Sequence, residues 1–135
     1  MRQSRFVAFG VVLVLVPAAF AALFGWRAVL EQSAMGLFLL AGGLAVLGAR
    51  VAAVEVGTVR VSWRHLVGAS FLVVALANVT REVPRVLAGT ASSYELLMAG
   101  WFVVMSCLLA FVGIDIARNG RHFDITPDVD CVVGL

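Results

Sequence analysis

Four long apolar stretches, separated by short charged or turn-forming segments, dominate the hydropathy pattern of the chain. They cover about residues 6–26, 34–54, 61–83 and 96–116. A helix of about 20 residues, with a rise of ~1.5 Å per residue, matches the thickness of the hydrocarbon core of a bilayer. The pattern therefore predicts an all-α integral membrane bundle of about four transmembrane helices. We expect residues 1–117 to form this bundle and residues 118–135 to form a short tail.

The third stretch is the weakest of the four, because its uninterrupted apolar part, residues 66–79, is too short to cross a bilayer. It spans only if the helix covers residues 61–83, with the charged side chains at its ends reaching the headgroups. Pro84 then marks the end of this helix. The connector of residues 27–33 is short enough to force an antiparallel hairpin. We therefore predict two antiparallel hairpins with short connectors.

Composition excludes an ordinary soluble domain, since 62% of the 135 residues are hydrophobic and only 13% are charged. The ten basic residues are all arginine, and their distribution predicts the orientation. Seven flank one end of the predicted bundle, namely Arg2, Arg5, Arg50, Arg60, Arg64, Arg118 and Arg121, and Arg27, Arg81 and Arg85 flank the other. Both termini are therefore expected on the cytoplasmic or interior side.

A second interpretation of the first stretch stays open. The layout of a signal peptide with cleavage near Ala21 is present in Arg2 and Arg5, the apolar residues 7–16, Pro17, and the small residues Ala19 and Ala21. The apolar run continues through Trp26, which disfavours cleavage. The other three spans keep the same orientation under either interpretation.

Small residues predict where helices approach one another, because lipid offers little hydrophobic drive for helix association. The helix-packing candidates are Ala41, Ala45, Ala49, Gly43 and Gly48 in the second span and Ser106 and Ala110 in the fourth. We interpret them as packing within one subunit, with self-association through the second span as the alternative.

An offset of 58 residues aligns several positions of the two halves. Gly10 meets Gly68, and Gly42 meets Gly100. This alignment has two interpretations: a duplicated hairpin, or chance matches in a chain composed largely of Ala, Val, Leu and Gly.

Ionisable residues lie at or beyond the span ends and not at the midplane, which disfavours a proton relay or an ion pathway. The interfacial charges are Arg50, Arg60, Arg64, Asp115 and Arg118. Asp115 and Arg118 are three residues apart and can pair on one helix face.

Two histidines, His65 and His122, fall on the same predicted side of the membrane. A pair of histidines on neighbouring helices can hold a haem or a metal ion, but no third histidine or ligand-spaced cysteine pair accompanies them. We therefore predict no cofactor and no metal. A disulfide between Cys107, inside a span, and Cys131, in the tail, is not expected.

The tail combines a turn at residues 126–128 with Phe123 and Ile125, which can lie against the membrane or a partner. No catalytic constellation, phosphate loop or nucleic-acid-binding module is evident in the sequence. We therefore predict a protein that is not an enzyme, whose partners are the lipid bilayer and other membrane subunits or a second copy.

The function predicted is that of a structural or accessory subunit of a membrane assembly. In size and topology, an arginine-rich chain of about four spans with both ends inside resembles the internal membrane proteins of archaeal enveloped viruses, which implies a structural role in a viral membrane. A small transporter or channel, and a redox subunit with haem at His65 and His122, are the alternatives.

Overall fold

The structure, a computed structural model, describes residues 2–120, 122–123 and 125–134. Its elements in chain order are the 3₁₀ turn η1 (Gln3–Arg5), the helices α1 (Phe6–Phe24), α2 (Trp26–Glu31) and α3 (Ser33–Arg50), the strands β1 (Ala53–Val56) and β2 (Val59–Ser62), the helices α4 (Trp63–Leu87) and α5 (Ser93–Ala117), and the strand β3 (Val132–Gly134). Within the described residues, four helices are long and apolar enough to cross a membrane. The fold is therefore mostly helical, as predicted, with a small sheet added.

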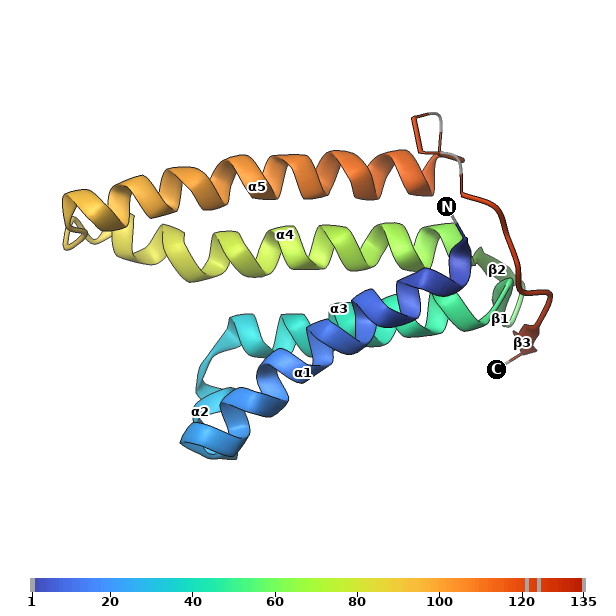
Figure 1. Ribbon diagram of the computed structural model, residues 1–135, viewed down its shortest axis with the longest axis horizontal. Coiled ribbons are helices and arrows are strands. Elements are labelled where there is room, and N and C mark those ends of the chain that lie inside the picture. The colour runs from blue at the N-terminus through green and yellow to red at the C-terminus, as the bar shows by residue number, and fades with distance from the viewer. Residues whose placement is uncertain (1, 121, 124, 135) are drawn as a thin grey trace.

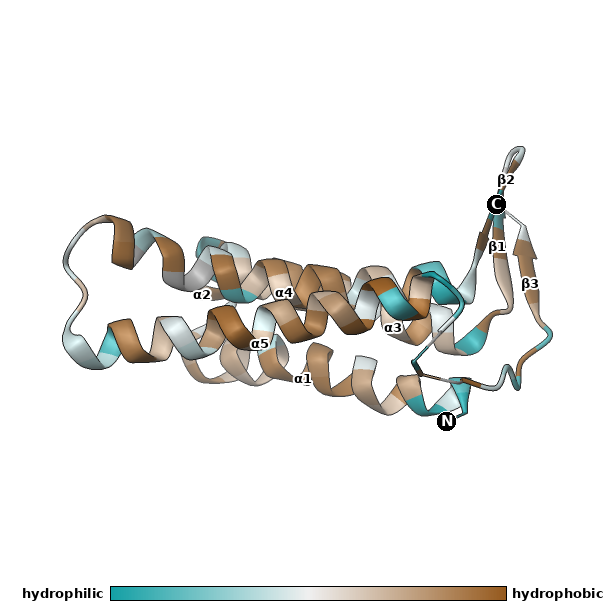
Figure 2. Ribbon diagram, turned by 90° about the horizontal axis from the view of Figure 1, so that it is seen from above, coloured by the Kyte–Doolittle hydropathy of each residue, from teal (hydrophilic) through white to brown (hydrophobic). Residues whose placement is uncertain are grey.

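The long helices form a series of contacts in which α1 packs on α3, α3 on α4 and α4 on α5. Both ends of the chain lie at the same end of the bundle, beside the sheet (Figure 1). We call this the terminal end; the opposite end, with α2 and the connection between α4 and α5, is the loop end. Hydrophobic residues cover the long helices along most of their length, and hydrophilic residues gather toward their ends (Figure 2).

The second span is shorter than predicted. We expected a helix over residues 34–54, but α3 ends at Arg50, and Val51 is already extended with φ −127° and ψ 146°. The β-branched residues that follow alternate with charged ones on both sides of Gly57, a pattern typical of a hairpin. The third span accordingly begins at Trp63 instead of residue 61, because Val61 and Ser62 belong to β2.

The small sheet has the strand order β2-β1-β3. β1 and β2 are antiparallel, with Val54 opposite Val61 and Glu55 opposite Arg60. Gly57 takes a φ of +60° in the two-residue turn between them, a conformation that favours glycine. β3 pairs with β1 in parallel, which connects the tail to the bundle. The all-α prediction was wrong for these strands.

The second hairpin also has boundaries that the pattern misplaced. Pro84 lies inside α4, which continues to Leu87, so the proline does not end the helix. α5 begins at Ser93, earlier than the predicted residue 96, because Ser92 and Glu95 form a capping box. The Ser92 hydroxyl accepts from the Glu95 amide at 3.3 Å, and the Glu95 carboxylate accepts from the Ser92 amide at 2.7 Å.

Glycines set the spacing within each hairpin. A Cβ on Gly10 of α1 would lie 2.8 Å from the carbonyl oxygen of Gly42 on α3, and a Cβ on Gly42 would lie 2.8 Å from that of Gly10. In the second hairpin, a Cβ on Gly68 would lie 2.6 Å from the Gly113 oxygen, and the reverse distance is 2.7 Å. Real Cβ atoms do not approach carbonyl oxygens this closely, so both contacts depend on glycine.

The offset of 58 residues aligns Gly10 with Gly68, and both of these glycines make a close contact. It does not align the glycines that they contact. Gly68 contacts Gly113, whereas Gly100, which aligns with Gly42, faces open space. The glycine contacts therefore recur in both hairpins without following the ungapped alignment.

Packing between the hairpins uses the small face of α3. Ala41, Ala45 and Ala49 are fully buried, and a Cβ on Gly48 would lie 2.9 Å from a methyl carbon of Val67 on α4. The aromatic stack of Phe9 with Phe71, at 4.7 Å between ring centroids, adds a direct contact between α1 and α4. Together, these contacts hold the two hairpins against each other at the terminal half of the bundle.

Two adjacent glycines of α3 give a matched test of this packing. Gly42→Ala places a methyl group 2.6 Å from a methyl carbon of Val14 and 2.8 Å from the Gly10 oxygen. We expect it to lower the free energy of unfolding in detergent by about 1 to 3 kcal/mol, the usual cost of overpacking. Gly43→Ala meets nothing within 4 Å and should be neutral or stabilise α3 by up to about 1 kcal/mol through helix propensity. Equal unfolding temperatures for the two variants would contradict the packing described.

Candidate functional site

The side-chain hydrogen bonds that join distant parts of the described chain lie at the terminal end. They connect η1, the ends of α3 and α5, the start of α4 and the tail. We call the described tail residues 122, 123 and 125–128 the strap, because they cross this end of the bundle. Because these hydrogen bonds gather there, we take the terminal end as the candidate functional site.

The chain reverses direction directly after α5. Asn119 and Gly120 both take positive φ values, 76° and 63°. The Gly120 amide donates to the carbonyl oxygen of Asp115 at 2.8 Å, which closes the turn around the last carbonyls of the helix. The reversal brings His122 back against Asp115, seven residues before it in the chain.

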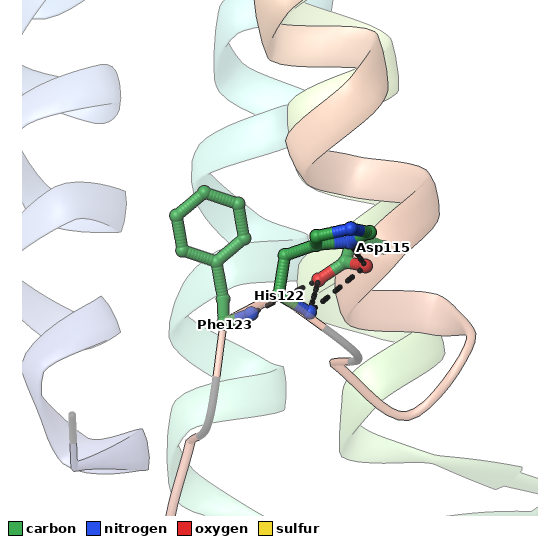
Figure 3. Close-up of polar contacts among 3 residues, drawn as sticks. All are labelled: Asp115, His122 and Phe123. Carbon is green, nitrogen blue, oxygen red and sulfur yellow. Dashed lines mark hydrogen bonds and ion pairs between the residues drawn. The ribbon is translucent and has the colours of Figure 1, made fainter.

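Asp115 is the buried carboxylate of this site, with 7% of its surface exposed. It accepts hydrogen bonds from the backbone amides of His122 and Phe123, at distances of 3.2 to 3.3 Å. The Nδ1 atom of His122 lies 2.8 Å from a carboxylate oxygen of Asp115, so both the backbone and the side chain of His122 contact this carboxylate (Figure 3). A carboxylate that accepts several N–H groups is well satisfied in a buried position, so Asp115 fixes the beginning of the strap.

The spacing in the sequence allows Asp115 to pair with Arg118 on one helix face, but other groups contact Asp115 in the structure. The contacts described for the Asp115 side chain are those with His122 and Phe123. α5 ends at Ala117, and Arg118 is its exposed C-cap residue with φ −90° and ψ 27°. The helical spacing on which the pairing depended therefore ends before Arg118.

Further along, the strap is attached on both sides. The backbone amide of Gln3 donates to the carbonyl oxygen of Thr126 at 3.2 Å. The backbone amide and the hydroxyl of Ser4 both donate to the Asp128 carboxylate, at 3.0 and 2.6 Å. On the other side, the Arg64 guanidinium donates to the Ile125 oxygen at 3.2 Å. The strap thus connects the start of α1 to the start of α4.

Gln3 is a second buried polar group of the site. Its side chain is fully buried, and its Nε2 donates to the carbonyl oxygens of Gly48 and Val51, each at 2.9 Å. These carbonyls lie at the C-terminal end of α3, where the helix itself supplies no donors. Gln3, which precedes α1 in the chain, therefore caps the C-terminal end of α3. The sequence analysis did not predict this role.

Below the strap lies an apolar core formed by Phe6, Ala49, Trp63, Val67, Ile116 and Ile125. Ile125 is almost completely buried. The sequence allowed it to lie against the membrane or a partner, and in the structure it packs into this core and anchors the strap to the bundle. Phe123, in contrast, keeps 44% of its surface exposed.

The other predicted charges have separate places at the terminal end. Arg60 pairs with Glu55 across the hairpin at 3.8 Å, with both side chains exposed. Arg64 lies over the Trp63 ring, 4.9 Å from its centroid. Arg50 and Arg118 are exposed.

The small residues predicted for packing are divided between buried and open positions. Gly43 lies on the exposed side of α3, whereas Gly48 is buried with the three alanines of the small face. On α5, Ser106 is buried and its hydroxyl donates to the Phe102 oxygen of its own helix at 2.7 Å, and Ala110 is half-buried. The glycines that determine the spacing within the hairpins, Gly10, Gly42, Gly68 and Gly113, were not among the candidates.

The two histidines have separate polar partners. His65 Nδ1 lies 2.7 Å from the Ser62 hydroxyl, and His122 Nδ1 contacts Asp115. Within the described residues, no group of three or more His, Cys, Asp or Glu side chains is placed so that it could hold a metal ion. Cys107 and Cys131 are both free and exposed.

The contribution of Asp115 to the strap can be measured by hydrogen exchange. Asp115→Ala leaves the amides of His122 and Phe123 without their acceptor, and we expect their exchange to rise by roughly tenfold or more. Asp128→Ala is the matched control, because it removes the contact with Ser4 at the other end of the strap. In this control, protection should fall at Ser4 and persist at His122. Unchanged exchange at His122 and Phe123 in Asp115→Ala would contradict the role of Asp115 at the beginning of the strap.

Comparison with known proteins yields one family. No match was found among curated proteins or among solved structures. One family model matches residues 1–129, a region that contains all four long helices and the strap. The match covers far more than half of the chain, and the chain therefore belongs to the family of unknown function DUF7994.

Proposed function

We propose that this chain is a multi-span membrane protein that serves as a structural or accessory subunit of a membrane assembly. The apolar surface that the long helices leave exposed carries the proposal. On α1 and α5, large apolar side chains remain open along the helices, among them Val12 at 58%, Leu15 at 58% and Trp101 at 61% exposed. Contacts with water at this scale are unfavourable, whereas the hydrocarbon of a bilayer covers such a surface at no cost.

The proposed orientation has the terminal end on the cytoplasmic or interior side. Six arginines of the described chain belong to this end: Arg2, Arg5, Arg50, Arg60, Arg64 and Arg118. Arg27, Arg81 and Arg85 belong to the segments near the loop end. The positive-inside rule favours the side with the larger number. Arg121, counted with the first group in the sequence, lies outside the described residues.

A structural role is supported by how the polar groups of the terminal end are used. Gln3 and Arg64 bind backbone carbonyls of the chain itself, and Asp115 binds backbone amides. These contacts fix the ends of the helices relative to one another. Such an arrangement suits a rigid element of a larger assembly.

The surface available for other subunits is not the small face of α3. The small face of α3 contacts α1 and α4 within the chain, so self-association through that face would displace them. α5 presents the wide outward surface instead, with Leu97, Trp101, Val104, Leu108 and Phe111 exposed. We propose this surface of α5 as the one that meets lipid and neighbouring subunits.

Cysteine accessibility tests the topology. Cys131 is a natural reporter of the terminal end once Cys107 is replaced by alanine, and Thr90→Cys, with both native cysteines removed, reports on the loop end. In sealed right-side-out vesicles, an impermeant maleimide should label Thr90→Cys and leave Cys131 unlabelled until the vesicles are opened. The reverse pattern would invert the orientation. Labelling of both sites in sealed vesicles would rule out an odd number of crossings between them.

The assembly itself is tested by purification in a mild detergent. We expect a particle heavier than one 14.3 kDa chain with its detergent, containing further copies or sister subunits that mass spectrometry identifies. A monodisperse monomer, found also after cross-linking in native membranes, would contradict the proposed role.

The absorption spectrum of the same sample tests the haem alternative. We expect no Soret band, and a band that His65→Ala or His122→Ala abolishes would replace the structural role by a redox one.

A further inference from the structure

A cavity of about 340 Å³ lies below the strap, between helices that belong to different hairpins. Its walls are Phe6 from α1, Phe71 from α4, and Val112 and Ile116 from α5. α1 packs mainly on α3, and α5 mainly on α4, so that α1 and α5 have little direct contact with each other. The cavity occupies part of the space that this arrangement leaves between them.

The strap closes the terminal end of this cavity. His122, Phe123 and Ile125 contribute to its lining there. The Phe123 ring points away from the strap (Figure 3) and lines the same cavity as Phe6 of α1. Its partial exposure shows that the closure is incomplete, and His122 is the polar residue of an otherwise apolar lining.

The lining of the cavity is apolar except where His122 of the strap contributes to it. The Phe6 and Phe71 rings meet edge to face, with their centroids 6.2 Å apart, and with Val112 and Ile116 they form the apolar part of the lining. Two exposed arginines adjoin the terminal end of the cavity in the chain: Arg5 directly precedes Phe6, and Arg118 follows Ile116 by two residues. The neighbouring acidic group, Asp115, is occupied by His122 and Phe123.

We propose that this cavity binds one acyl chain of a membrane phospholipid, with the phosphate beside Arg5 and Arg118. A volume of about 340 Å³ lies within the usual range of small-molecule sites, and the lining is mostly apolar with few polar groups, as such sites are. In the proposed orientation, Arg5 and Arg118 fall at the level of the headgroups, and Phe6 and Phe71 fall where the hydrocarbon begins. The inference rests on the proposed membrane location, because the lipid enters from the surrounding bilayer.

The experiment uses the full chain in liposomes that contain phosphatidylglycerol with a photoactivatable diazirine on one acyl chain. After irradiation, mass spectrometry maps the lipid adducts. We expect them to concentrate on Phe71, Val112 and Phe123. Adducts spread evenly over the outward surface of α5, at residues such as Val104 and Leu108, would overturn the proposal.

Substitutions at Val112 distinguish a filled cavity from lipid at the surface. Val112→Phe fills the space and should reduce the adducts at Phe71 by roughly fivefold or more, whereas Val104→Phe, two turns earlier at an exposed position of α5, should leave them unchanged. Val112→Ala enlarges the cavity and should retain the adducts. If Val112→Phe does not fold, the wild-type map and Val112→Ala decide the question. Equal adduct yields at Phe71 in the two phenylalanine variants would overturn the cavity.

The position of the phosphate is tested with R5Q combined with R118Q. At low ionic strength, this double variant should lower adduct formation at Phe71 by roughly threefold, and R27Q, at the loop end, should not. An unchanged yield would overturn the placement of the phosphate.

Flotation of the same liposomes separates the two proposals. A protein that does not float with lipid fails as a membrane protein, and one that floats but shows scattered adducts fails only as a binder of lipid in this cavity.

Discussion

The close approach of helix backbones at glycine is the constraint on which the rest of the structure depends. Gly10 and Gly42 meet within the first hairpin, and Gly68 and Gly113 meet within the second. In each pair a single added methyl group would overlap a carbonyl oxygen of the neighbouring helix. Since apolar side chains gain little by moving from lipid to a helix interface, close van der Waals contact is the main source of association energy in a bilayer. The separation of the helices, and hence the reach of every contact at the terminal end, follows from these glycines.

The terminal end depends on that spacing because its polar contacts are short and connect different elements. Gln3 reaches two carbonyls at the end of α3 only if α1 begins close beside that end. Arg64 reaches the strap only if α4 begins nearby. Asp115 serves a different purpose, since it determines where the strap starts and not how the helices pack. The packing thus determines where the helix ends lie, and the polar contacts connect these ends to one another.

The sequence was sufficient to predict the long helices, because hydropathy over about 20 residues is a strong signal that tertiary contacts rarely override. It was not sufficient for the boundary after Arg50, where the apolar residues Val51 and Val54 continue the hydropathy of the span although the backbone has become extended. The alternation around Gly57 does indicate a hairpin, but it lies within an apolar stretch whose length is also typical of a span. Hydropathy alone does not distinguish a short valine-rich strand from the end of a helix.

The candidate site was harder to predict, for reasons that differ between residues. Gly42 and Gly43 are adjacent and chemically identical, and only the rotation of α3 against α1 decides which of them is buried. Asp115 was recognised as an interfacial charge, but its partner depends on a turn with two positive φ values, which spacing on a helix cannot represent. For Gln3 the sequence offers no signal, because one glutamine between two arginines reads as a solvated terminus. Its role exists only once α3 ends beside it.

The parallel pairing of β3 with β1 also has a consequence for the order in which the fold is completed. β1 and β2 are neighbours in the chain and can pair as soon as both have been synthesised, but β3 follows α5. During synthesis, β1 therefore waits with one open edge until all four long helices have emerged. A nascent chain interrupted before residue 132 therefore keeps an unpaired strand edge, which is a template for pairing with another chain.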